Sequence, residues 1–97
     1  MSVYVIAEIN VKDRAGYDRE FQPLAREMLK AAGAEFVVGD DNPKGLLGKM
    51  TNRIVIAKFR NMAAVDNWYD GFKNLVSTVG EKYADFRMFA AEDAKTA

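Results

Sequence analysis

The chain has 97 residues and no net charge, because 14 lysine and arginine residues balance 14 aspartate and glutamate residues. Without a basic run to contact phosphates, this composition argues against nucleic-acid binding. The sequence contains neither cysteine nor histidine, which excludes disulfides and thiolate nucleophiles and removes the usual general base near neutral pH.

The first predicted element is a strand over Val3–Val11, where the side chains alternate between two faces. One face is wholly apolar and should pack on helices. The other face is mixed and carries Tyr4, Ile6, Glu8 and Asn10. The chain start enters this strand without the basic region of a signal peptide. No apolar run approaches the ~20 residues of a membrane span, so a cytoplasmic protein without a membrane partner is expected.

A first helix should begin at Asp13, whose carboxylate can accept hydrogen bonds from free backbone N–H groups. Its apolar stripe recurs at helical spacing: Tyr17, Phe21, Leu24 and Met28. Pro23 lies inside this stripe and lacks an N–H group, which predicts a kink or break near Gln22. Gly33 supplies the C-terminal stop.

The middle of the chain predicts two strands separated by a loop. Residues 34–38 are apolar enough for a short strand, and residues 39–45 are rich in turn formers. Residues 46–50 are expected to add a short extended piece. Arg53–Phe59 is rich in isoleucine and valine on both faces, which is typical of a central strand.

A second helix should be capped by Asn61, and its buried stripe should hold Val65, Trp68, Tyr69 and Phe72. Gly71 is expected to end or bend it, with a further helical piece reaching Gly80. Residues 83–91 alternate again and predict the last strand, with Tyr83, Asp85, Arg87 and Phe89 on one face. The tail, residues 92–97, has nothing to bury and is expected to fray.

The element order is β-α-β-β-α-β over one domain, residues 1–97, an α+β arrangement of the ferredoxin-like type. In this fold two helices cover one face of an antiparallel four-stranded sheet. The other face would expose a larger apolar patch than monomers usually tolerate. A second copy packed against this face would cover it, so a homodimer is expected; the alternative is a solvated face with scattered aromatics.

Several stretches resemble a known family in order along nearly the whole chain. They are Tyr4 to Ile9, Asp13 with Tyr17, Gly33 followed by Phe36-Val37-Val38, residues 53–56 with Phe59, and Trp68-Tyr69. This pattern is similar to domain-of-unknown-function family 1330, in the dimeric α/β-barrel superfamily. The resemblance implies a ferredoxin-like protomer and a dimer whose two sheets face each other around a barrel. Because relatives in the superfamily perform different reactions, the fold alone implies none.

Five residues are candidates for a small-molecule site in the barrel cavity: Glu8, Arg53, Trp68, Tyr69 and Arg87. The two arginines could clamp a carboxylate, or they could form salt bridges to Glu8 or Asp85. The aromatic pair could wall a pocket, although such a pair on a helical stripe is more often core. Glu8 could serve as a general base if burial raised its pKa, or it could be half of a structural ion pair.

The leading hypothesis is a homodimeric binding protein that holds a small anionic or aromatic molecule in the barrel cavity. The alternative is an enzyme of the cofactor-independent monooxygenase or isomerase type, in which the cavity positions a reactive substrate. Whether a reaction is catalysed stays open at this point. No metal site or cofactor is predicted, since the loop at Asp40 lacks the ligand set of a calcium site.

Overall fold

The computed structural model describes residues 2–94. Four strands alternate with helical segments in the order expected from the sequence. The elements are β1 (Val3–Val11), α1 (Arg14–Gly16), a π-helical turn η1 (Tyr17–Phe21), α2 (Gln22–Ala31), β2 (Glu35–Asp40), β3 (Arg53–Phe59), α3 (Met62–Thr78), a 3₁₀ turn η2 (Gly80–Lys82) and β4 (Ala84–Glu92).

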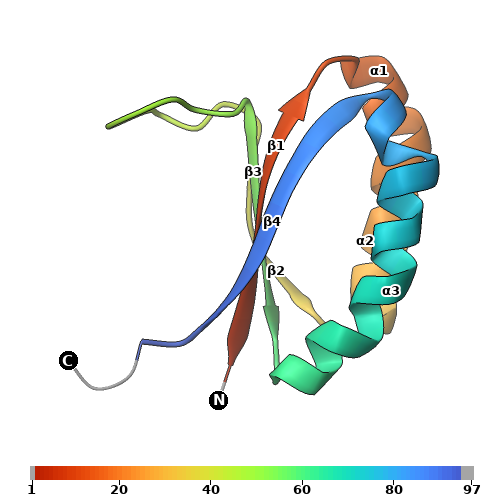
Figure 1. The fold of residues 1–97 in the computed structure, drawn as a ribbon, viewed down its shortest axis with the longest axis vertical. Helices are drawn as coiled ribbons and strands as arrows, with labels where there is room; N and C mark the ends of the chain where they lie inside the picture. Colours follow the sequence, from red (N-terminus) through yellow and green to blue (C-terminus); the bar gives the residue numbers. More distant parts are fainter. Residues whose placement is uncertain (1, 95–97) are drawn as a thin grey trace.

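Within residues 2–94 the strands form one four-stranded sheet in the order β2-β3-β1-β4, and every neighbouring pair is antiparallel. The helices all cover the same face of this sheet (Figure 1). This is the ferredoxin-like arrangement, so the predicted fold is confirmed. No helix or strand of residues 2–94 covers the opposite face, which is called the open face below.

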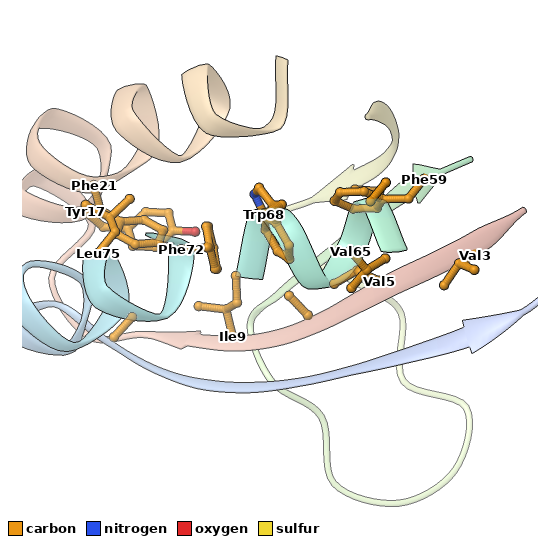
Figure 2. Close-up of a cluster of buried hydrophobic side chains, with 14 of the residues drawn as sticks. Val3, Val5, Ile9, Tyr17, Phe21, Phe59, Val65, Trp68, Phe72 and Leu75 are labelled. Atoms are coloured by element: carbon orange, nitrogen blue, oxygen red, sulfur yellow. The ribbon is translucent and has the colours of Figure 1, made fainter. Parts of the chain in front are cut away.

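The hydrophobic core lies between the helices and the sheet. The apolar alternation of β1 is confirmed, because Val3, Val5, Ala7, Ile9 and Val11 are all buried. Aromatic rings continue through the core as a connected series (Figure 2). Tyr17 lies 5.2 Å from Phe21, Phe21 5.9 Å from Phe72, and Phe72 4.5 Å from Trp68, measured between ring centroids.

The disturbance predicted near Gln22 takes the form of a π turn, and the helical segment continues through Pro23. Proline cannot donate the backbone hydrogen bond that a regular helix requires. The preceding turn widens instead, and the Gln22 N–H group donates to the Tyr17 carbonyl oxygen five residues earlier. Such π turns insert one extra residue per turn and are frequent at functional sites. Here the turn places Tyr17 and Phe21 in the core and begins α2 with Pro23 in its first turn.

Two further expectations about the C-terminal half are wrong. α3 runs without interruption through Gly71, because one glycine weakens a helix by only about 1 kcal/mol and the buried stripe outweighs it. Tyr83 does not lie on the open face. Its ring packs over Gly16, close to where a Cβ atom would be, and its carbonyl oxygen accepts from the N–H groups of Lys12 and Asp13.

The tail expectation is also wrong at its start, since β4 extends to Glu92. Asp93 is tied to the beginning of the chain by two hydrogen bonds with Ser2. Residues 95–97 of the predicted tail lie outside the described residues.

The loop between β2 and β3 projects from the end of the sheet, away from the helices (Figure 1). Residues 46–50 were expected to be extended, but they form no strand in this described loop. Leu46 and Leu47 at its tip are 86% and 91% exposed. β2 itself reaches Asp40, two residues beyond its predicted end.

Two glycines test how tightly the core is packed. A Cβ atom at buried Gly80 would lie 2.9 Å from the rings of Phe21 and Phe86, whereas Gly71 has open space around the same position. Gly80→Ala should therefore lower the free energy of unfolding by about 1–3 kcal/mol through overpacking. Gly71→Ala, the matched control, should raise it by up to about 1 kcal/mol through helix propensity. Urea unfolding measures both, and equal effects would contradict this packing.

Candidate functional site

The open face brings together two of the five candidate residues, Glu8 and Arg87. They are direct neighbours on β1 and β4, and Arg87 Nε donates to Glu8 Oε1 over 2.6 Å. The Arg87 side chain is 73% exposed, so solvent screens this pair and it adds little to stability. Of the two alternatives left open by the sequence, the salt bridge is the one that forms.

Arg53 lies on the other side of the sheet. Its neighbour on β1 is Ile9, whereas Glu8 faces Ile54, and successive strand residues point to opposite faces. The Arg53 side chain is 4% exposed and is buried under the helices. The sequence predicts all five candidates around one cavity. Arg53 instead points to the helix-covered face of the sheet, whereas Glu8 and Arg87 point to the open face.

Arg53 belongs to a closed ring of polar contacts at the end of the core near α1. Its Nη1 donates to Asp41 and its Nη2 donates to Gln22 Oε1 over 3.0 Å. Gln22 Nε2 in turn donates to Asp18 over 2.9 Å. Arg14 closes the ring, with its Nη1 lying 2.9 Å from Asp41 and 3.7 Å from Asp18.

The π turn accounts for this arrangement. The five-residue hydrogen bond from Gln22 to Tyr17 stacks these two residues on the helix side that faces β3. Gln22 then reaches the guanidinium of Arg53, which also lies 5.8 Å from the centroid of the Tyr17 ring. Arg14 lies 6.0 Å from the same centroid, so two cations contact one aromatic ring.

The burial of Tyr17 raises the pKa of its hydroxyl above the usual value, although the positive charge of Arg53 acts in the opposite direction. The phenol is therefore protonated at neutral pH. Asp41 shows the reverse balance. Burial alone would raise the pKa of its carboxyl, but hydrogen bonds from Arg53 and Arg14 outweigh burial and lower it.

A small cavity of about 50 Å³ lies beside Arg53, between the helices and the sheet. Its lining is aromatic and aliphatic apart from a few polar side chains. The lining residues are Ala7, Ile9, Tyr17, Phe21, Gln22, Ala25, Arg26, Leu29, Phe36, Arg53, Val55, Phe72 and Phe86. The Nε atom of Arg53 is buried and has no hydrogen-bond partner in the described part of the chain, which is a costly state for a polar group.

Phe36, Arg26 and Leu29 line both this cavity and an open groove of about 510 Å³ on the surface, and they form the wall that the two share. Phe36 is 44% exposed, and its ring packs over Gly39, where a Cβ atom would be 2.5 Å from a ring carbon.

Trp68 is a core residue, which confirms the interpretation that an aromatic residue on a helical stripe belongs to the core. It is 7% exposed and lies 5.0 Å from Phe59 and 4.5 Å from Phe72 between ring centroids. Its indole Nε1 is buried without a hydrogen-bond partner among residues 2–94. The prediction that Tyr69 is buried with it is wrong, because Tyr69 is 43% exposed and lies beside Lys73, Val76 and Glu81 in a surface groove. Neither residue lines the cavity beside Arg53.

Sequence reasoning missed Tyr17, Gln22 and Asp41 as partners of Arg53. The sequence predicts Tyr17 as part of the apolar helix stripe, and it marks Gln22 only as the residue before a proline. The sequence does contain one relevant signal. Arg53 is a charged residue at the start of a strongly apolar strand, and a buried charged residue requires hydrogen-bond partners. Which loop would supply the anion depends on tertiary structure, because Asp41 is 12 residues from Arg53.

The family profile of a domain of unknown function, DUF1330, matches residues 2–77. The chain belongs to the DUF1330 family. No curated protein sequence matches it. The match covers every residue of the polar ring around Arg53 and ends within α3.

Two solved structures resemble this DUF1330 chain. One is a protein of unknown function, RPA0582, from Rhodopseudomonas palustris, with a TM-score of 0.64 and 16% identity over 98% of this chain and 84% of the other. The second is HapK from Hahella chejuensis, with a TM-score of 0.63 and 18% identity over 100% and 96% of the two chains. At these identities the similarity establishes the shared fold.

Within residues 2–94, the structure of this DUF1330 member contains no cluster of three or more acidic residues arranged to hold a metal ion. Among the same residues, no helix combines the length and the apolar character needed to cross a membrane.

The lowered pKa of Asp41 predicts a pH dependence of stability. A carboxylate whose folded-state pKa lies below its unfolded value of 3.8 stabilises the fold above that value. The contribution disappears as pH falls through the folded-state pKa. Wild type should thus be more stable than Asp41→Asn at neutral pH, and the difference should shrink below 3.8. Urea unfolding of both proteins across this range measures it, and a constant difference would contradict the ion pairs.

Proposed function

We propose that this protein binds a small aromatic carboxylate inside each protomer, in the cavity beside Arg53. The observation that carries the proposal is a buried guanidinium with an unpartnered Nε at an aromatic-lined cavity. Burying a cation costs several kcal/mol unless it is paired, and Asp41 and Gln22 supply acceptors for Nη1 and Nη2 but not for Nε. A ligand-binding role explains why an arginine occupies this position.

The lining supports the ligand class. A guanidinium recognises a carboxylate through two parallel hydrogen bonds, which gives both strength and orientation. The rings of Tyr17, Phe21, Phe72 and Phe86 line the same cavity and would contact an aromatic ring at their edges and faces. The protonated hydroxyl of Tyr17 adds a further donor.

The size of the cavity sets a condition on binding. About 50 Å³ holds one or two water molecules, since each takes about 30 Å³ in the liquid. An aromatic carboxylate needs more space, so the wall at Phe36 has to open toward the adjoining groove of about 510 Å³. Phe36 is suited to this movement because almost half of its surface is already exposed.

We also propose that the protein is a homodimer in which two open faces meet. Apolar side chains of three strands point to this face: Tyr4 and Ile6 from β1, Ile54 and Ile56 from β3, and Phe89 from β4. Phe89 is 50% exposed in the protomer. A second copy would remove these groups from water, and each Å² of apolar surface buried in this way stabilises the dimer by about 25 cal/mol. The Glu8–Arg87 pair would then lie within the interface.

The ligand proposal is tested with benzoate and with its neutral analogue benzamide. Benzoate should bind wild type and quench or shift the fluorescence of Trp68, because Phe72 lies in the cavity wall and stacks on the indole. Arg53→Met should weaken binding by about tenfold to a hundredfold, the value of a charged hydrogen bond. Arg87→Met, on the open face, is the matched control. Equal affinity of wild type and Arg53→Met, or of benzoate and benzamide, would contradict the proposal.

The dimer is tested by sedimentation equilibrium. Ile56→Lys places a cation among the apolar groups of the open face and should weaken association by at least about tenfold, because a buried charge needs a partner. Lys30→Glu on the exposed side of α2 should have no effect. Wild type that sediments as a monomer at micromolar concentration would rule the dimer out.

A further inference from the structure

We propose that Asp41 occupies the carboxylate subsite of the ligand-free protein, and that a bound carboxylate displaces it and releases the β2–β3 loop. This inference rests on the ligand site proposed at Arg53. It adds a built-in competitor to that site and a conformational consequence of binding.

The two halves of the Arg53–Asp41 pair differ in how firmly they are held. The Arg53 side chain is 4% exposed, but the Asp41 side chain is 59% exposed. Arg53 lies in the sheet, paired to β1, whereas Asp41 is the first residue after β2. Water therefore competes for the carboxylate of Asp41 but has little access to the guanidinium of Arg53. The anion is thus the replaceable half.

The hydrogen bonds of Arg53 indicate which acceptor has to leave. Its Nη1 donates to Asp41, its Nη2 donates to Gln22, and its Nε has no partner among the described residues. The guanidinium has five N–H donors, so only a carboxylate that binds end-on, across Nη1 and Nη2, takes the position of Asp41. The exchange proposed here is at this end-on edge. Gln22 is fixed in the helix, where its amide also donates to Asp18. Asp41 belongs to the loop and can move into solvent.

Charge balance favours this exchange. Replacing one carboxylate by another keeps the buried guanidinium neutralised throughout, so the protein avoids the cost of an unpaired buried cation. Asp41 also remains close to Arg14, whose side chain is 40% exposed and lies 2.9 Å from it. Displaced Asp41 can therefore keep a cationic neighbour at the surface.

Release of Asp41 has a direct consequence for the loop. Asp41 anchors one end of it through Arg53 and Arg14. Asn52 anchors the other end by two hydrogen bonds with the backbone of Val11, at 2.7 and 2.9 Å. Lys44 and Lys49 lie between these anchors. Loss of the first anchor should make the segment between them easier to cleave.

The experiment combines benzoate titration with limited trypsin digestion at Lys44 and Lys49. Asp41→Asn removes the competing charge and should bind benzoate about threefold to tenfold more tightly than wild type, because the apparent Kd equals the intrinsic Kd divided by the fraction of molecules whose site is free. Saturating benzoate should speed cleavage of the wild-type loop several-fold, and Asp41→Asn should be cleaved fast without ligand. Asp40→Asn, whose side chain accepts from the Asn42 N–H group, is the matched control and should resemble wild type.

The outcomes separate this inference from the ligand proposal. If benzoate binds through Arg53, but Asp41→Asn binds it no more tightly and the wild-type loop is cleaved at an unchanged rate, the displaced anchor is overturned and the ligand site stands. If neither wild type nor Asp41→Asn binds benzoate, both proposals fail. The loop measurement in unaltered protein keeps the test decisive even if Asp41→Asn is less stable.

Discussion

The buried charge of Arg53 is the constraint on which the surrounding structure depends. A guanidinium at this depth requires acceptors from several directions, and they come from three separate parts of the chain. Gln22 comes from the helix, Asp41 from the loop after β2, and the ring of Tyr17 from the π turn. An apolar residue at position 53 would leave these groups with no common partner. The polar ring is therefore a single unit, although its members lie far apart in the sequence.

Parity along the strands decides what each charged residue can do. Glu8 and Arg87 share a face and neutralise each other in solvent, whereas Arg53, opposite Ile9, enters the core. Both arginines looked equivalent as candidate anion clamps. The difference in burial separates them, because a hydrogen-bonded charge is worth much more when water is excluded from it.

The sequence predicts most of the fold because its periodicities are strong. The alternation of Val3–Val11, the caps at Asp13 and Asn61, and the stripe from Val65 to Phe72 all correspond to observed features. The sequence does not determine which face of the sheet Arg53 points to, because Arg53–Phe59 is apolar on both faces and its pattern fits either register. The contact between Asp41 and Arg53 cannot be predicted from the sequence, because a turn-rich loop gives no indication of its contacts. The π turn cannot be predicted either, because proline predicts a disturbed hydrogen bond but not how the helix adapts to it.

The π turn gives chain length a structural role of its own. Asp18, Arg19 and Glu20 are exposed, so the loss of any one of them would remove no side chain from the core. Such a loss would close the wide turn to regular α-helical spacing, with the Gln22 N–H group still bonded to the Tyr17 carbonyl oxygen, so Tyr17 would keep its side of the helix. In the chain as it stands, regular spacing through the same residues would instead rotate Tyr17 by about 100° around the helix axis, away from Arg53. The wide turn is thus what keeps Tyr17 at the cavity in a chain of this length.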